Sequence, residues 1–317
     1  MNIILKAKKA NDIVFSKLFN IKNFNEVSYE WLEYKEKQIK QSTYYNYKFI
    51  IEKYIVPYFN NKNIRKMRDF NLFIDDLSTR LSPKTIRDII NVFKAILTYY
   101  EDTYSKKLKY KKIVLPKQDK KEIEVLTSKE KDRIEKYCMN FKNLKLLGII
   151  ISLNTGMRLG ELCALRWKNI DLTEKCIYVK ETAQRVYKGK GIKSKVIIDT
   201  PKTKCSVRTI PINTKLLNIL KPLKQGYTDD DFFLTGSKTR CLEPRSYQDI
   251  FKKVLAKAKV KEHNFHCTRH TFATNCIEVG MDIKTLSKIL GHANVQITLN
   301  TYVHTSKKQM KKYLEKL

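Results

Sequence analysis

A lysine-rich run at residues 106–121 divides the chain into two parts with different sequence patterns. The run holds eight lysines and one acid, Asp119, and Pro116 interrupts any helix there. Such a charge run is most often a solvated linker, and a basic one can also follow a polyanion. We therefore expect one domain over residues 28–105 and a second domain over residues 122–304.

The chain carries a large excess of positive charge. Its 317 residues include 64 Lys and Arg against 32 Asp and Glu, which gives a formal net charge of +32. Cations placed on phosphates release condensed counterions, so this excess favours a nucleic-acid partner. The alternative is a merely solvated surface, but its net charge is usually in single digits.

Neither a membrane segment nor a metal centre is expected. No run approaches the roughly 18 consecutive apolar residues of a membrane span, and the first residues lack the apolar length of a signal peptide. The seven cysteines are odd in number and lack zinc-knuckle spacing. We therefore expect reduced thiols, no metal ion and a cytoplasmic protein.

The part before the linker has helical periodicity. Residues 1–27 show none and are expected to form a short N-terminal extension. Four helices should follow and pack as a small bundle. The first helix should run from Trp31 to about Ile39, and Ser42 or Thr43 should cap the second. Asp69 should cap the third, and the Ser82-Pro83 pair should start the fourth. The last helix has one broad apolar stripe, formed by Ile86, Ile89, Ile90, Phe93, Ile96, Leu97 and Tyr100.

The part after the linker mixes helices with a few strands. A buried helix over residues 144–153 should end at Gly156, and a helix over residues 158–167 should follow. From Ser246 onward the pattern is helical again. We expect a mainly α fold with one small antiparallel sheet, hence the α+β class. The strand-like runs are residues 176–179, 196–199 and 207–212, and the expected caps are Thr127 with Glu130, Asp282 and Asn294.

Arg158 is the first candidate for chemistry. It lies two residues after Gly156, at the start of an expected helix. An arginine there either pairs with an acid, for which Glu161 is one turn away, or faces an anion at the helix start. For this residue alone both interpretations stay open.

A second group of candidates lies between residues 266 and 302. His266 and Arg269 share one face of a helix. The positive charge of a half-buried arginine needs a negative partner, and a phosphate would provide one. His292 follows the glycine that should end the next helix, and Tyr302 lies in the last full turn of the helix after it. A phenol has a pKa near 10, so it needs nearby positive charge and a base to act as a nucleophile. The alternative for each histidine and for the tyrosine is a core position.

Together and in this order, these residues resemble the tyrosine recombinase (phage integrase) family. The similarity covers residues 28–317. The segment Pro201–Pro211 is most similar to integrases of conjugative transposons and phages of Gram-positive bacteria. The motifs that carry the resemblance are Thr155–Leu162, Pro201–Pro211, His266–Thr274, Leu290–His292 and Tyr302.

The resemblance implies that the chain cuts and rejoins DNA without ATP, cofactor or metal ion. Tyr302 would attack the scissile phosphate, form a 3′-phosphotyrosyl ester and free a 5′-hydroxyl. Arg158 and Arg269 would hold the non-bridging oxygens, where charge builds up, and His292 would donate a further hydrogen bond.

The resemblance also implies two residues for proton transfer. His266 is expected to exchange a proton with the tyrosine hydroxyl. Lys202, on a turn of a hairpin, would protonate the leaving oxygen, and Lys204 is the rival for that role.

A C-shaped clamp on double-stranded DNA is the expected architecture, with an N-terminal helical core-binding domain and a C-terminal catalytic domain. Family members act as homotetramers, so residues 305–317 would dock on a neighbouring protomer; packing on their own domain is the alternative. Accessory DNA-bending or directionality factors are expected partners. The expected DNA contacts are Lys106, Lys107, Lys109, Lys111, Lys112, Lys204 and Arg208.

The leading interpretation is a site-specific recombinase that integrates and excises a mobile element. A chromosome-dimer resolvase of the Xer type is the alternative within the family. A DNA-binding regulator that has lost catalysis is the alternative from another class, but a pure binding protein has no need of the phenol. A monomeric type IB topoisomerase would share the chemistry and would need no partner site.

Overall fold

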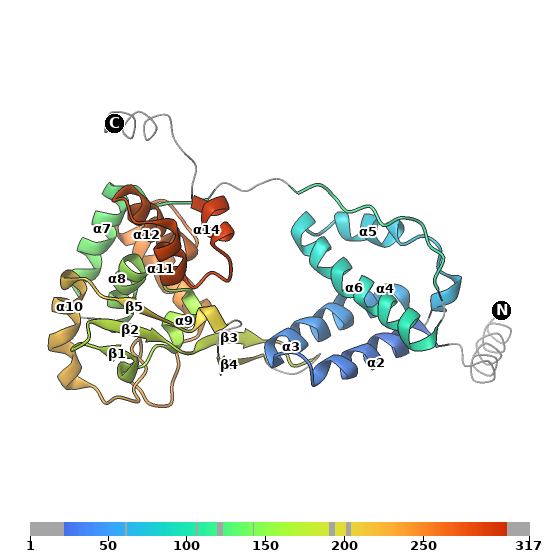
Figure 1. Ribbon diagram of the computed structural model, residues 1–317, viewed down its shortest axis with the longest axis horizontal. Helices are drawn as coiled ribbons and strands as arrows, with labels where there is room; N and C mark the ends of the chain where they lie inside the picture. The colour runs from blue at the N-terminus through green and yellow to red at the C-terminus, as the bar shows by residue number, and fades with distance from the viewer. Residues whose placement is uncertain are drawn as a thin grey trace. The chain divides into compact units, whose positions relative to one another are not determined.

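The computed structural model describes residues 22–60, 62–105, 107–118, 123–141, 143–189, 194–200 and 204–302; for Lys204 it describes the backbone alone. The described residues form two compact units, divided between residues 120 and 121, with residues 186–195 joining the first unit (Figure 1). Each unit has an apolar core built from its own residues. None of the helices in these ranges is both long enough and apolar enough to span a bilayer.

The first unit is helical, and its longest helix is the best predicted. Ser82 caps that helix by accepting a hydrogen bond from the Thr85 N–H, and proline follows at the first helical position. Every residue of the expected apolar stripe is buried. The elements are α2 (Phe24–Glu36), α3 (Gln41–Ile50), a π-helical turn (Ile51–Ile55), α4 (Val56–Phe59), a 3-10 turn (Ile64–Lys66), α5 (Asn71–Ser78) and α6 (Pro83–Tyr104).

The other helix starts differ in part from expectation. Helix α2 begins seven residues before Trp31, because Asn23 and Glu26 form a capping box and Phe24 is fully buried in the core. Ser42 does not cap α3, since the helix begins at residue 41. Asp69 lies one residue before the N-cap of α5, which is Phe70, so it is not the cap that we expected, although its carboxylate accepts a hydrogen bond from the Asn71 N–H at 3.0 Å.

Residues 107–118 run along the first unit and are anchored to it. The Lys111 N–H donates to the carbonyl of Arg68 at 2.8 Å, and the Val114 N–H donates to the Asn71 side chain at 2.9 Å. Arg87 donates to the Pro116 carbonyl at 2.9 Å. The expectation of a solvated linker therefore holds for the lysine side chains but not for the backbone. The exposed lysines are Lys107, Lys109, Lys111, Lys112 and Lys117, and the apolar residues that pack on the core are Leu108, Ile113 and Leu115.

The second unit combines helices with short strands, so the expected mainly α, α+β class is confirmed. Thr127 and Glu130 form the expected capping box, and Asp282 caps its helix as predicted. The helices are α7 (Ser128–Met139), α8 (Leu144–Thr155), α9 (Leu159–Ala164), α10 (Thr214–Leu220), α11 (Pro244–Lys257), α12 (His266–Glu278), α13 (Ile283–Leu290) and α14 (Val295–Tyr302). The strands are β1 (Ile170–Asp171), β2 (Cys176–Val179), β3 (Thr182–Val186), β4 (Lys195–Asp199) and β5 (Arg208–Pro211).

The strands form two sheets, where we expected one. Strands β1, β2 and β5 make an antiparallel sheet in which Ile177 pairs with Ile210. Strands β3 and β4 make a second sheet. Strand β4 pairs with β3, and β5 pairs with β2, so β4 and β5 do not pair with each other as we expected. Helix α9 is also shorter than predicted and ends at Ala164.

Helices α8 and α12 are packed together in the second unit, with α13 and α14 against α12 (Figure 1). The buried hydroxyls of Ser152 and Thr268 share a hydrogen bond of 2.7 Å across α8 and α12. This contact fixes the start of α12 next to the end of α8. The candidate site is built at that junction.

Candidate active site

Two glycines end the helices that border the site. Gly156 follows α8 with a φ of +65°, and Gly291 follows α13 with a φ of +66°. A Cβ at Gly156 would lie 2.6 Å from the Phe272 ring, and one at Gly291 would lie 2.8 Å from the Arg208 side chain. The left-handed turns and the close approach both require glycine at these two positions.

The ends of these helices hold the guanidinium of Arg269. This residue is 1 % exposed. Its Nη1 donates to the carbonyl of Gly156 at 2.8 Å, and its Nη2 donates to the carbonyl of Leu290 at 2.8 Å. Burial, with Arg158 and Arg208 nearby, lowers the pKa of Arg269 to about 9, so the group stays charged at neutral pH.

Three consecutive carbonyls at the end of α13 each accept a hydrogen bond from a different arginine. The carbonyl of Ile289 accepts from Arg208 at 2.6 Å, and that of Leu290 accepts from Arg269. The carbonyl of Gly291 accepts from Arg158 at 3.2 Å. The unpaired carbonyls at the C-terminus of a helix carry partial negative charge, which suits guanidinium groups. One helix end therefore sets the positions of three cations.

Glu161 is the buried acid of this cluster and is 3 % exposed. Its carboxylate accepts two hydrogen bonds from the Arg208 side chain, at 2.8 and 2.9 Å, and two from Arg158, one from Nη1 and one from the backbone N–H, both at 2.8 Å. Burial acts to raise the pKa of Glu161, but the hydrogen bond and charge of Arg208 and the charge of Arg158 outweigh it, so the pKa is lowered. The carboxylate is therefore ionised at neutral pH.

The two arginines bound to Glu161 differ in exposure. The side chain of Arg208 is 5 % exposed and is enclosed by its partners, which argues against the DNA contact that we expected of it. The side chain of Arg158 is 35 % exposed. Both interpretations of Arg158 are therefore compatible: it pairs with Glu161, and part of its side chain stays exposed to a ligand.

His292 is held between Arg269 and Thr298. Its Nε2 lies 2.8 Å from Nη2 of Arg269, and its Nδ1 lies 2.7 Å from the Thr298 hydroxyl. A guanidinium can only donate, so Nε2 is the acceptor and the ring proton is on Nδ1. Burial and the charges of Arg269, Arg158 and Arg208 lower the pKa of His292 to about 4. To donate to a phosphate, His292 must first gain a proton on Nε2.

Tyr302, on α14, reaches the same cluster. Its hydroxyl lies 2.9 Å from Nδ1 of His270. Its ring is parallel to the ring of His292, with 6.5 Å between the centroids. Burial raises the pKa of Tyr302, and the charges of Arg269 and Arg158 act in the opposite direction.

His270 is the site residue that sequence reasoning missed. We expected His266 beside the phenol, but the structure places His270 there. His266 is exposed, and its ring meets the His270 ring edge to face, with 4.6 Å between the centroids. The sequence did carry a signal for His270: it lies four residues after His266, so both rings are on one face of α12.

The structure thus brings together five of the six expected catalytic residues. The sixth, Lys202, lies outside the described residues, as does Lys106 among the expected DNA contacts. For the rival Lys204, the backbone belongs to the 3-10 turn Lys204–Ser206. The five that gather are Arg158, His266, Arg269, His292 and Tyr302.

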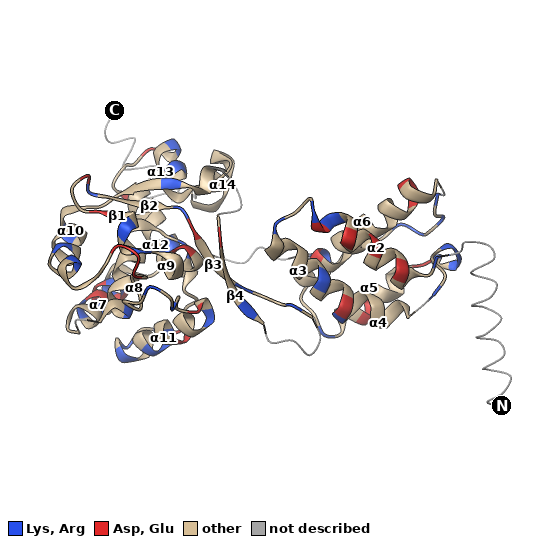
Figure 2. Ribbon diagram, turned by 90° about the horizontal axis from the view of Figure 1, so that it is seen from below, with Lys and Arg blue, Asp and Glu red and all other residues tan. Residues whose placement is uncertain are grey.

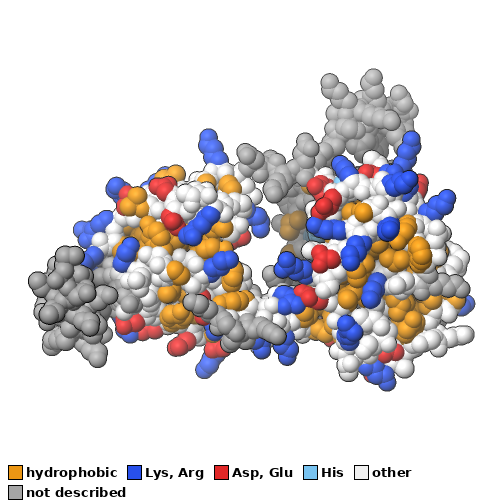
Figure 3. Space-filling model, turned by 180° about the vertical axis from the view of Figure 1, so that it is seen from behind, with side chains coloured by type: hydrophobic (Ala, Val, Ile, Leu, Met, Phe, Trp, Pro, Cys, Tyr) orange, Lys and Arg blue, Asp and Glu red, His pale blue; other side chains and the backbone are white. Residues whose placement is uncertain are grey.

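Basic side chains are spread over both units outside this cluster. Figure 2 shows Lys and Arg on many helices of each unit, and Figure 3 shows them around apolar patches on one face. Among the described residues, no group of three or more His, Cys, Asp and Glu side chains is arranged to hold a metal ion.

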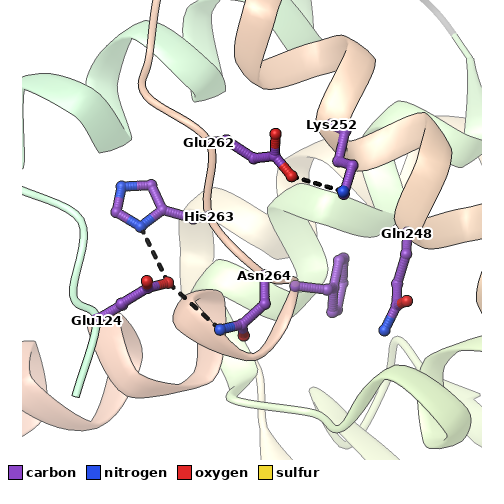
Figure 4. A pocket seen from close by; sticks show the side chains of 7 residues that line it. Glu124, Gln248, Lys252, Glu262, His263 and Asn264 are labelled. Atoms are coloured by element: carbon purple, nitrogen blue, oxygen red, sulfur yellow. Dashed lines mark hydrogen bonds and ion pairs between the residues drawn. The ribbon is translucent and has the colours of Figure 1, made fainter. Parts of the chain in front are cut away.

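A cavity of about 460 Å³ lies beside α11 and contains none of the clustered residues (Figure 4). Glu124 stands 3.4 Å from Nδ1 of the buried His263, and Glu262 pairs with Lys252 at 2.5 Å. Two carboxylates facing one lysine suit a phosphate poorly. We therefore assign the chemistry to the arginine cluster rather than to this cavity.

The chain matches known proteins over most of its length. Residues 114–309 match the phage integrase family, and residues 23–69 match the phage integrase N-terminal SAM-like domain. A tyrosine recombinase XerC-like protein of Caldanaerobacter subterraneus subsp. tengcongensis is 35 % identical over 260 residues, which cover 74 % of this chain and 66 % of that protein. The integrase of Staphylococcus phage L54a is 27 % identical, with 91 % of each chain covered.

Solved structures show the same fold. An integrase fragment of the transposon Tn1549, in complex with transposon right-end DNA, superposes with a TM-score of 0.74 at 20 % identity. The superposition covers 93 % of this chain and 99 % of that fragment.

Proposed function

The chain belongs to the phage integrase family, and on that basis we propose that it is a site-specific DNA recombinase that acts through a 3′-phosphotyrosyl intermediate. The observation that carries the proposal is the buried guanidinium of Arg269. Within the described residues it donates to two backbone carbonyls and to the neutral ring of His292, and its charge acts on the phenol of Tyr302. A buried cation without its own counter-ion, next to a potential nucleophile, is suited to bind the phosphate that the nucleophile attacks.

The charge balance of the cluster supports a phosphate ligand. Three guanidinium groups, those of Arg158, Arg208 and Arg269, surround the single carboxylate of Glu161, an excess of two positive charges. A phosphodiester gains further negative charge as it becomes pentacoordinate. Hydrogen-bond donors that are already fixed in position stabilise that charge without having to reorganise. In many enzymes this electrostatic effect is the largest single contribution to the rate enhancement.

We propose the following roles for the clustered residues. Tyr302 attacks the phosphorus, and Arg158 and Arg269 hold the non-bridging oxygens. His292 donates to the same oxygens once Nε2 carries a proton, and an arriving phosphate favours that proton. His266, at the exposed edge of the cluster, takes part in proton transfer near the phosphate.

The leaving 5′-oxygen needs a proton from an acid. We propose Lys202 for this role and keep Lys204 as the rival, since both lie in the segment that joins β4 to β5. With the phosphotyrosine conserving the bond energy, the reaction needs no ATP.

We propose that the reaction integrates and excises a mobile element, which the similarity to the integrase of phage L54a supports. The similarity to a XerC-like protein supports the alternative, a chromosome-dimer resolvase. Sequencing the junctions that flank the gene separates the two. An excised circle with matching junctions supports the element, and a lone chromosomal site supports the resolvase.

Double-stranded DNA is the proposed substrate, bound by both units as a C-shaped clamp in the bacterial cytoplasm, with accessory DNA-bending or directionality factors. Recombination would take place in a homotetramer in which residues 305–317, which lie outside the described residues, dock on a neighbour. Deleting residues 306–317 should then impair synapsis and strand exchange more than binding to a single half-site. An equal loss of both would remove the idea of docking in trans.

A covalent-trapping assay tests the proposed activity. A nicked half-site duplex, with the sequence read from the junctions, should form a stable protein–DNA adduct because the cleaved strand diffuses away. Tyr302→Phe should abolish the adduct and leave half-site affinity unchanged. Binding without any adduct in the unaltered protein would favour a DNA-binding regulator.

A further inference from the structure

The phenol of Tyr302 lies against His270. Its hydroxyl is 2.9 Å from Nδ1 of that ring. A protonated phenol can donate to an unprotonated ring nitrogen, and in that pairing the ring proton of His270 is on Nε2. The charge of Arg269 acts on the same phenol and favours its ionised form.

The position of His270 follows from the geometry of α12. Successive residues of a helix are turned by about 100°, so Arg269 points into the core while His270 faces α14, which carries Tyr302. His266 lies one turn earlier on the same face and touches the edge of the His270 ring. His270 thus stands between the exposed His266 and the nucleophile.

We propose that His270 orients the hydroxyl of Tyr302 and accepts its proton when the oxygen attacks the phosphorus. The inference rests on the proposed recombinase function. In cleavage, the Tyr302 O–H bond breaks as the O–P bond forms, and the proton moves to Nδ1 of His270. The bond from phosphorus to the 5′-oxygen breaks, and that oxygen takes a proton from the general acid. In rejoining, the 5′-hydroxyl returns its proton to the acid, and the imidazolium returns its proton to the tyrosine oxygen.

The electrostatic surroundings agree with this role. Burial and then the charge of Arg269 lower the pKa of His270, so the ring is neutral and able to accept at neutral pH. Burial raises the pKa of Tyr302, so the phenol keeps its proton until a base removes it. His270 contacts Tyr302 from α14 and His266 from its own helix, and the charges of Arg269 and of Glu124, from the segment before α7, act on it. The charge of Glu124 favours the imidazolium once it has formed.

The test uses the full-length protein and the nicked half-site duplex described above. His270→Asn keeps an acceptor oxygen near the position of Nδ1 but cannot take a proton at working pH. It should bind the duplex with unchanged affinity and form the adduct at least about 100-fold more slowly, the usual contribution of a general base. His266→Asn is the matched comparison, and its loss should be smaller.

Three readouts separate proton transfer from a structural role. The rate of adduct formation by the unaltered protein should fall as the pH is lowered below neutrality. His270→Asn should lose this acid limb of the pH–rate profile, and His266→Asn should keep it. Free imidazole should restore adduct formation to His270→Ala. A 5′-bridging phosphorothiolate duplex, whose sulfur leaves without a proton, should rescue Lys202→Ala but not His270→Asn.

The outcomes are distinct from those that bear on the proposed function. If the unaltered protein forms the adduct and His270→Asn forms it within about threefold of the same rate, His270 is not the base. Loss of the acid limb in His266→Asn alone would transfer the role to His266. Rescue of His270→Asn by the phosphorothiolate would assign His270 to the acid step instead. An adduct that survives Tyr302→Phe would reject the nucleophile, and with it the function.

Discussion

Arg269 is a buried cation whose partners are neutral, and this explains the protonation of the groups around it. Its guanidinium donates to His292, which fixes the proton of that ring on Nδ1 and keeps the ring neutral. Its charge also acts on Tyr302, where it favours the ionised phenol. One buried cation therefore sets the tautomer of a histidine and favours the nucleophilic form of a tyrosine.

The pH dependence of stability should report the neutral state of His292. Its folded pKa of about 4 lies below the unfolded value of about 6.5, so folding favours the uncharged ring. This stabilisation is complete above pH ~6.5 and is lost as the pH falls toward 4. From pH 7 to pH 5 the ring should account for a loss of about 1 kcal/mol in the free energy of unfolding, after allowance for its partial exposure. The free energy of unfolding can be measured with urea at both pH values. The His292→Gln variant should lose about 1 kcal/mol less than the unaltered protein between pH 7 and pH 5. An equal loss in the two proteins would contradict the neutral state of His292.

Arg208 should matter for stability rather than for DNA binding. Arg208→Met leaves the carboxylate of Glu161 buried with only Arg158 as a partner, which should lower the free energy of unfolding by about 3 kcal/mol. The slope of log DNA affinity against log salt should not change. Lys109→Met, at an exposed position of the basic run, is the matched control: it should leave stability unchanged and reduce the slope by about 0.9. The opposite pattern would restore Arg208 as a phosphate contact.

At the scale of elements, the site depends on where helices end. Helix α8 ends just before Gly156 and α13 just before Gly291, and carbonyls at these ends bind the arginines. The sequence predicts both ends, because a glycine stops each apolar pattern. It does not predict which cations the carbonyls bind, since most of those contacts join residues far apart in the chain, as for Arg158 and Gly291.

The strands show why pairing is harder to predict than helix ends. Strand β2 is predicted with its observed bounds because its residues are apolar and mostly buried. Strand β3 contains Gln184 and Arg185 and has no apolar alternation, so it was missed. Strands β4 and β5 were recognised, but their partners depend on contacts elsewhere in the unit and cannot be read from adjacency.

Replacing Gly291 tests the role of the α13 end. Gly291→Ala adds a Cβ at a φ of +66°, 2.8 Å from the side chain of Arg208, and should cost about 3 kcal/mol of stability. It should also slow adduct formation by at least about tenfold, because it shifts carbonyls that hold Arg158 and Arg269. Gly280→Ala is the matched control, since its φ is +88° but its Cβ would meet open space. It should cost about 1 kcal/mol and leave the rate intact, and equal effects of the two variants would argue against the proposed role of the α13 end.

At the scale of the whole molecule, the two units have separate cores, and the clustered residues all come from the second unit. The basic run belongs to the first unit through the contacts of residues 107–116 with α5 and α6. Chemistry and part of the expected DNA-binding surface are thus carried by different units. Removing one should leave the fold of the other.

A fragment of residues 121–317 should therefore fold on its own. Its main core contains no side chain from the first unit, so urea should unfold it in a single cooperative transition. Near-UV circular dichroism would measure the packing of its aromatic residues. Binding of a hydrophobic dye without a cooperative transition would show that the second unit depends on the first.

The most direct test of the central claim is to identify the residue that carries DNA in the trapped adduct. After nuclease and protease digestion, mass spectrometry should find a nucleotide joined through phosphate to the peptide that contains Tyr302. The account predicts that this peptide alone is modified. A nucleotide on a different residue, with Tyr302 unmodified, would contradict the account even if the protein cuts and rejoins DNA.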